Sequence, residues 1–215
     1  MPSFLTRRTT HAASPQSALP PGARHHAGRR RRHCQHGDAL VNLMLAVMIM
    51  ILLAVIGIPA INGIVIEGRT PDVAAELQRF MARMRAMGTA GTNLPYANVS
   101  NANNLAPATR EATTLRTTGT VVAHRLGGSG TGNSGTVTLS PADLSGAGLG
   151  SAYSLTITDV HDKACPTLAS IMATSSEEMS LNGNAIKNTA TPYNASDAQR
   201  HCTDGENNDF TFVAR

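Results

Sequence analysis

The longest apolar segment of the chain runs from Ala39 to Ile66 and contains no charged side chain. Its 28 residues (39 to 66) exceed the roughly 20 that a helix needs to cross a bilayer. We therefore predict a membrane-spanning helix over 39–66. Three residues interrupt the apolar pattern: Asn42 near its start, and Pro59 and Asn62 in its second half. Because proline removes a backbone hydrogen bond, Pro59 predicts either a fixed kink or a local opening of the helix.

Apolar side chains recur at helical spacing beyond this segment, and Gly88 is a typical helix stop. We interpret residues 70–88 as an amphipathic continuation of the same helix, packed on a globular domain. Thr70-Pro71-Asp72 also fits a helix start, so the alternative is a break near Arg69 that gives two rods. The predicted apolar face consists of Val73, Leu77, Phe80, Met81, Met84 and Met87.

The second half of the chain shows short alternating apolar patterns separated by glycine, asparagine and proline. Residues 89–113 are predicted to form a surface loop with one helical turn. The turn at 127–130 suits a hairpin connection, and it is no phosphate loop because no Lys-Ser/Thr pair follows. The predicted fold class is α+β, a long N-terminal α-helix on a small antiparallel β-sheet head. We expect strands at 119–126, 136–139, 153–160, 179–181, 185–187 and 209–214, and a short helix at 165–173.

Charge divides the chain just before the apolar segment. The chain has 18 Lys and Arg against 14 Asp and Glu, a net charge of +4. Residues 1–37 hold seven of the arginines and no acidic residue, which leaves 11 basic against 14 acidic residues, a net of −3 (11 − 14). A basic block beside a spanning segment predicts a cytoplasmic N-terminus and a C-terminal domain on the other side. We therefore expect no nucleic-acid binding, although the pI of the whole sequence is about 9.3.

The basic segment, residues 1–37, has almost none of the large apolar side chains that a packed core needs. It does not fit a conventional secretory signal, whose apolar core is only about 7–15 residues long and ends in an A-x-A-like site. Gly37 is its last residue and stands directly before Asp38 and the apolar run.

A basic leader ending in glycine, followed by a long apolar helix with proline at the twenty-second position (59 − 37), resembles the precursors of type IV pilins. The long leader points to the type IVb branch. The stretches SLTITDV, CPTL and FTFVAR are similar to the pilins of toxin-coregulated pili and of conjugative thin pili. The resemblance implies that a prepilin peptidase cuts between Gly37 and Asp38 and that the new N-terminus is N-methylated. The domains would be a cleaved leader, 1–37, the helix, 38–88, and a globular head, 89–215.

Two residues after the cut depart from the pattern of the family. The family usually has an apolar residue at the first mature position, where this chain has Asp38, and glutamate at the fifth, where it has Asn42. That glutamate neutralises the terminal ammonium of a neighbouring subunit inside the apolar filament, whereas Asn42 carries no charge. We expect the carboxylate of Asp38 to supply the counter-charge. Tip subunits of the family can lack the glutamate, so a minor pilin is an alternative.

Cys165 and Cys202 are the only cysteines that follow the leader, which itself contains Cys34. An oxidising periplasm favours a disulfide between them, and the resemblance implies the C-terminal disulfide of type IV pilins. The alternative is two independent buried thiols.

Candidate catalytic and metal-binding residues are sparse. His161 and Asp162 near Cys165 would suit a Cys–His nucleophile, but a disulfide removes that thiol. An acidic cluster near Cys202 has the ligand type of a Ca²⁺ site, although we favour a solvated loop. We predict no enzyme activity, no cofactor and no metal site. The histidines interpreted as surface residues are His124, His161 and His201, and the acidic cluster is Asp204, Glu206 and Asp209.

The resemblance thus implies a structural subunit that polymerises through its N-terminal helix into a type IVb pilus for adhesion, aggregation or conjugative contact. Its expected partners are further copies of itself, the prepilin peptidase, the inner-membrane assembly machinery and, before assembly, the membrane. The precursor is expected in the inner membrane with its C-terminus in the periplasm, and the subunit then in an extracellular pilus. The alternatives are a minor pilin or pseudopilin and, in another class, a single-pass membrane-anchored periplasmic binding domain.

Overall fold

The computed structural model describes residues 36–89 and 91–215, without the side chains of 36–38 and 58–60. Of the predicted leader, all but the last two residues lie outside the described part. The chain divides into two compact units, one ending at Ala46 and one beginning at Val47, and each is described by itself.

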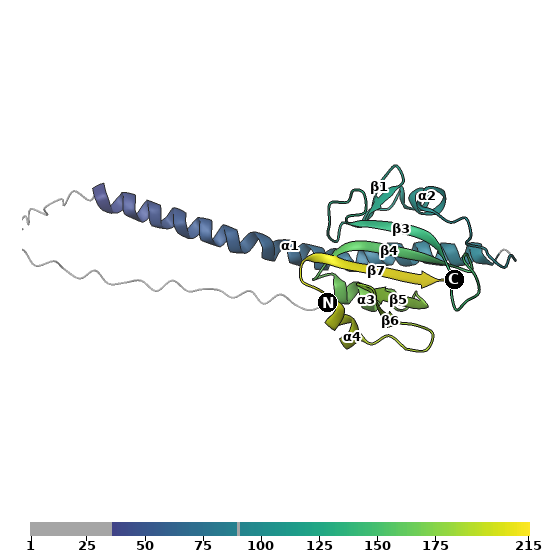
Figure 1. The fold of residues 1–215 in the computed structure, drawn as a ribbon. Helices are drawn as coiled ribbons and strands as arrows, with labels where there is room; N and C mark the ends of the chain where they lie inside the picture. The colour runs from purple at the N-terminus through teal and green to yellow at the C-terminus, as the bar shows by residue number, and fades with distance from the viewer. Residues whose placement is uncertain (1–35, 90) are drawn as a thin grey trace, which may run out of the picture. The chain divides into compact units, whose positions relative to one another are not determined.

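The predicted long N-terminal helix is present as α1, His36–Gly88. Figure 1 shows its C-terminal part running along the sheet. The loop expected at 89–113 contains a π-helical turn and a short helix, and a further helix before Cys202 was not predicted. The helical elements after α1 are η1 (Asn101–Leu105), α2 (Ala106–Thr109), α3 (Cys165–Met172) and α4 (Ala195–His201).

Helix α1 continues through Thr70 and Pro71, so the alternative of a break near Arg69 is wrong. The side chain of Thr70 is buried, and its hydroxyl donates a hydrogen bond to the carbonyl of Ile66 at 3.0 Å. Pro71 has no amide hydrogen, so one carbonyl of the preceding turn lacks its usual helical partner. The Thr70 hydroxyl bonds to the neighbouring carbonyl of that turn. The residues that looked like a helix start therefore lie in the interior of the helix.

All strand pairs of the seven-stranded sheet are antiparallel, in the order β1-β2-β3-β4-β7-β5-β6. The last strand in the sequence, β7, is inserted between β4 and β5. Asn182 and Gly183, both with positive φ (51° and 79°), form the turn between β5 and β6, a conformation that an Asn-Gly pair adopts readily. The strands are β1 (Arg116–Thr118), β2 (Val121–Ala123), β3 (Thr136–Ala142), β4 (Ala152–His161), β5 (Glu178–Leu181), β6 (Asn184–Lys187) and β7 (Glu206–Ala214).

The prediction of a single strand at 119–126 is wrong. The chain reverses at Gly119-Thr120, and β1 pairs with β2 through Arg116 opposite Ala123. Beyond Ala123 the side chains of His124 and Leu126 are both buried, with Arg125 in the left-handed region (φ 60°), so the strand cannot continue. The loop at 127–130 does connect two antiparallel strands, β2 and β3, as predicted.

The core lies between one face of the sheet and the C-terminal half of α1. Val73, Leu77, Met81 and Met84 of α1 are buried, as the periodicity predicts. Met87 is 49% exposed, so the prediction that it lies on the buried face is wrong. Two residues earlier, Arg85 already reaches the end of the sheet and donates to the backbone carbonyls of Ser175 and Arg215. The strands contribute Val137, Leu139, Tyr153, Leu155, Ile157, Phe210 and Phe212, and α3 contributes Leu168, Ala169 and Met172.

Candidate functional site

The most unusual surface of the molecule is the apolar part of α1. Every large apolar side chain from Leu40 to Ile56 is at least 47% exposed. Within the described residues, α1 is the one helix long and apolar enough to cross a membrane, with a mean hydropathy of 2.9 in its most apolar window. A helix that is apolar on all sides is stable only when lipid or protein covers it. The segment therefore requires a bilayer or partner helices around it.

The residues with predicted roles in processing and assembly lie in this helix. Gly37, Asp38 and Asn42 all belong to α1, and Asn42 is exposed. Positions 38 and 42 are four residues apart and so occupy one face of a helix, one turn from each other. The side chains of Asp38 and Pro59 lie outside the described ones, although the helix itself runs through Pro59. Their proposed roles therefore remain predictions.

A disulfide joins Cys165 and Cys202, with 6.0 Å between their Cα atoms. Cys165 is the first residue of α3 and is fully buried, while Cys202 ends α4. The bond ties α4, which contributes only Ala198 to the core, to the well-buried helix α3. The predicted pairing is thus confirmed, and the alternative of two independent thiols is wrong.

Two of the three acidic residues near Cys202 accept hydrogen bonds from the backbone. A carboxylate oxygen of Glu206 accepts from the amide of Gly128 at 2.9 Å, and one of Asp209 accepts from the amide of Asp159 at 2.9 Å. His161 contacts Asp162, its neighbour in sequence. No group of three His, Cys, Asp or Glu side chains suited to a metal ion occurs in the part of the chain that the structure describes.

His124 is fully buried, so its interpretation as a surface residue is wrong. Its Nδ1 accepts from the amide of Leu126 at 3.0 Å, and its Nε2 lies 2.8 Å from the carbonyl of Thr158. This pattern requires the neutral ring with its proton on Nε2. Burial lowers the pKa of His124, against smaller opposing effects of the Thr158 hydrogen bond and the charges of Asp159 and Glu206.

The lowered pKa of His124 predicts that acid destabilises the head. The unfolded chain takes up a proton near pH 6.5 and the folded chain only at lower pH, so stability is full above about 6.5 and falls below it. One such group gives a slope of at most about 1.4 kcal/mol per pH unit. We expect urea unfolding of wild type to show this extra loss between pH 7 and 5. His124→Gln, whose amide donates and accepts but does not titrate, should lack it; an unchanged slope in that variant would contradict the assignment.

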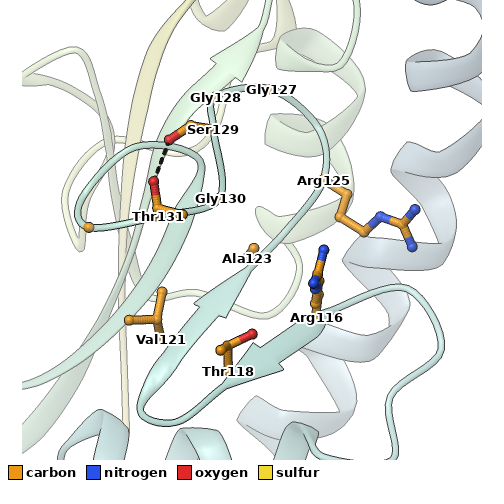
Figure 2. A pocket seen from close by; sticks show the side chains of 11 residues that line it. Arg116, Thr118, Val121, Ala123, Arg125, Gly127, Gly128, Ser129, Gly130 and Thr131 are labelled. Carbon is orange, nitrogen blue, oxygen red and sulfur yellow. Dashed lines mark hydrogen bonds between the residues drawn. The ribbon is translucent and has the colours of Figure 1, made fainter.

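A surface cavity of about 520 Å³ lies between the β1–β2 hairpin and the glycine-rich loop that follows β2 (Figure 2). Two arginines, Arg116 of β1 and Arg125, line it together with small and hydroxyl-bearing residues. The sequence singled out the loop only as a hairpin connection. Neither arginine stood out, because the cavity forms only once the register places Arg116 opposite Ala123.

A comparison with protein families found a match for the C-terminal part of the chain. Residues 112–215 match the family model described as PilS N terminal. This match covers 104 of the 215 residues (112 to 215), slightly less than half of the chain. The structure of the type IVb pilin from Salmonella typhi is similar, with 20% sequence identity over 65% of this chain and 95% of that chain, and a TM-score of 0.48. The sequence matches no curated protein.

The family match begins at residue 112, after α1, η1 and α2, and it includes the whole sheet and both cysteines of the disulfide. The head and the long apolar helix together are the α+β architecture that the resemblance implied. The exposed apolar surface of α1 is therefore the candidate functional surface of this chain.

Proposed function

We propose that this protein is a type IVb pilin that is made as a precursor, is cut between Gly37 and Asp38 by a prepilin peptidase, and polymerises through α1 into a filament. The observation that carries the proposal is the apolar surface of α1, exposed on all sides from Leu40 to Ile56. A bilayer covers such a surface before assembly, and the same surface of neighbouring subunits covers it in a filament.

The proposed localisation follows from charge and redox chemistry. The seven arginines of the leader hold the N-terminus in the cytoplasm, so the head is translocated to the periplasm. The disulfide between Cys165 and Cys202 is consistent with that oxidising compartment. After processing, the subunit leaves the inner membrane through the assembly machinery and becomes part of an extracellular pilus. It performs no chemistry itself, and the filament serves adhesion, aggregation or conjugative contact.

A tip or minor pilin is the second candidate, and the identity of Asn42 favours it. A subunit at the tip has no subunit ahead of it, so its fifth mature residue need not carry a charge. Under this proposal the chain would be present in few copies per filament, whereas a major pilin forms the whole shaft.

The mature chain is expected to lack the 37 residues of the leader and to begin with N-methylated Asp38. Intact-mass measurement and N-terminal sequencing of the membrane fraction would establish both. Gly37→Ile, which places a bulky side chain at the cut, should leave the precursor intact and serves as the matched control. The amount of the chain in filaments sheared from cells would separate a major from a minor pilin. Recovery of an unprocessed wild-type chain would contradict the proposal and favour a plain membrane anchor.

A further inference from the structure

We propose that the cavity between the β1–β2 hairpin and the loop 127–132 binds an anionic saccharide, a sugar that carries a carboxylate or a phosphate group. The proposal concerns the head alone and goes beyond polymerisation. The side chains of Arg116 and Arg125 both line the cavity and are exposed (Figure 2). Within the described part of the chain, neither guanidinium has a hydrogen-bond or ion-pair partner. Two positive charges at one hollow are thus available to a ligand.

The position of Arg125 is fixed by the buried residues on either side of it. His124 and Leu126 are both fully buried, and the amide of Leu126 donates to Nδ1 of His124 at 3.0 Å. The carbonyl of Leu126 accepts from the amide of His161 at 2.9 Å. These contacts hold the backbone of Arg125 at φ 60°. This conformation is unfavourable for residues other than glycine, asparagine and aspartate. Residues kept in such a conformation are concentrated at ligand sites, where the backbone strain directs a side chain.

The loop that forms the other wall is preformed. A Cβ atom at Gly128 would lie 2.3 Å from the backbone nitrogen of Gly135, so the two ends of the loop are in close backbone contact. The amide of Gly130 donates to the carbonyl of Ser134 at 2.8 Å, which closes the tip. The cavity therefore exists without a ligand, and little ordering of the chain opposes binding.

The cavity's lining identifies the class of ligand. Guanidinium groups bind carboxylate and phosphate oxygens in a paired geometry. Hydroxyl groups of Thr118, Ser129 and Thr131 offer partners for the hydroxyls of a sugar. The volume of about 520 Å³ is within the range of small-ligand sites, roughly 300–1,000 Å³. Val121 and Ala123 are the only apolar side chains of the lining, whereas protein partners require an apolar centre. A saccharide therefore fits better than a segment of a second protein.

Calorimetric titration of the full chain in an uncharged polyoxyethylene detergent tests the proposal. The probes are a hexasaccharide of alternating glucuronate and N-acetylglucosamine, glucose 6-phosphate, and the neutral maltohexaose. We expect the carboxylated or the phosphorylated sugar to bind, and maltohexaose not to bind. Comparing the two anionic probes shows whether the cavity binds a carboxylate or a phosphate group. Arg116→Ala and Arg125→Asn should each weaken binding about tenfold or more, as expected for a lost charged hydrogen bond.

Two matched variants separate charge from folding. Gly132 has φ 60°, and a Cβ atom there meets no atom within 4 Å, so both asparagine and aspartate are tolerated. Gly132→Asp should weaken binding by charge repulsion, and Gly132→Asn should not. Arg125→Asn places a favoured residue at a positive φ, so its melting temperature should equal or exceed that of wild type while binding is weakened.

Three results would overturn the proposal. The first is that no saccharide binds, and the second is that maltohexaose binds as well as the anionic sugars. The third is that the arginine variants bind the anionic sugars normally but yield fewer filaments. That outcome would assign the cavity to a contact with a second copy of the chain, and it would leave the proposed polymerisation intact.

Discussion

Replacing both Cys165 and Cys202 by serine is expected to lower the free energy of unfolding of the head by about 4 kcal/mol. The disulfide joins residues that are 37 positions apart, and removing it frees a loop of that length in the unfolded chain. A loss of this size is a large share of the roughly 5–15 kcal/mol that stabilises a typical domain. The helix α4 should separate first, because Ala198 is its only fully buried residue.

Urea unfolding of the full chain in detergent, followed by tyrosine fluorescence, would measure this loss. The chain has three tyrosines and no tryptophan, and two of the tyrosines, Tyr96 and Tyr153, are buried in the head. Wild type under reducing conditions is the matched control and should show a similar loss without a change of sequence. The variant Cys165→Ala with Cys202→Ala separates the missing bond from the cost of burying a hydroxyl group at position 165. A loss under about 1 kcal/mol in all three would contradict the expected role of the bond.

Replacing Asp38 by alanine is expected to abolish filaments, because it removes the proposed counter-charge of the terminal ammonium. In an apolar filament core an unpaired charge costs several kcal/mol per subunit. Asn42, one helical turn away, is polar but uncharged. We therefore expect Asn42→Ala to reduce filament yield much less than Asp38→Ala. Yield is measured as the amount of chain in sheared filaments relative to the amount in membranes.

The matched comparison for this experiment is Asp38→Glu, which keeps the carboxylate and should restore filaments. Processing of each variant is checked by intact mass, so that a failure of cleavage is not mistaken for a failure of assembly. Normal filaments from Asp38→Ala would rule out the carboxylate as the counter-charge. If Asn42→Ala alone prevented assembly, the amide at the fifth position would be the group that meets the ammonium.

The parts of the fold that could be predicted are those where burial imposes a regular pattern. In β4 and β7 buried side chains alternate with partly exposed ones, because a single face of each strand contacts α1. The stripe from Val73 to Met84 follows the helical period for the same reason. In contrast, η1 and α4 are short and polar, and side-chain caps of Ser100 and Asn194 stabilise their first turns. No apolar period marks such elements, so the sequence predicted only one helical turn within 89–113 and did not reveal α4.

The features of the candidate functional surface that depend on composition could be predicted from the sequence. Those that depend on how the strands pair could not. The length and hydropathy of α1 follow directly from its residues. The pairing of Cys165 with Cys202 followed from their being the only cysteines after the leader. The cavity at Arg116 and Arg125 depends instead on how two short strands pair. The burial of His124 depends on a hydrogen bond to a carbonyl of a distant strand. Information of that kind is three-dimensional and is absent from local spacing.

The central place of β7 has a consequence for biogenesis. This strand pairs with β4 on one side and β5 on the other, and it supplies Phe210 and Phe212 to the core. Until residues 206–214 have emerged, both neighbouring strands present open edges to other chains. The head can therefore close only after synthesis has passed β7, when α1 has long been available for insertion into the membrane. Under the proposed function, α1 can therefore enter the membrane before the head closes.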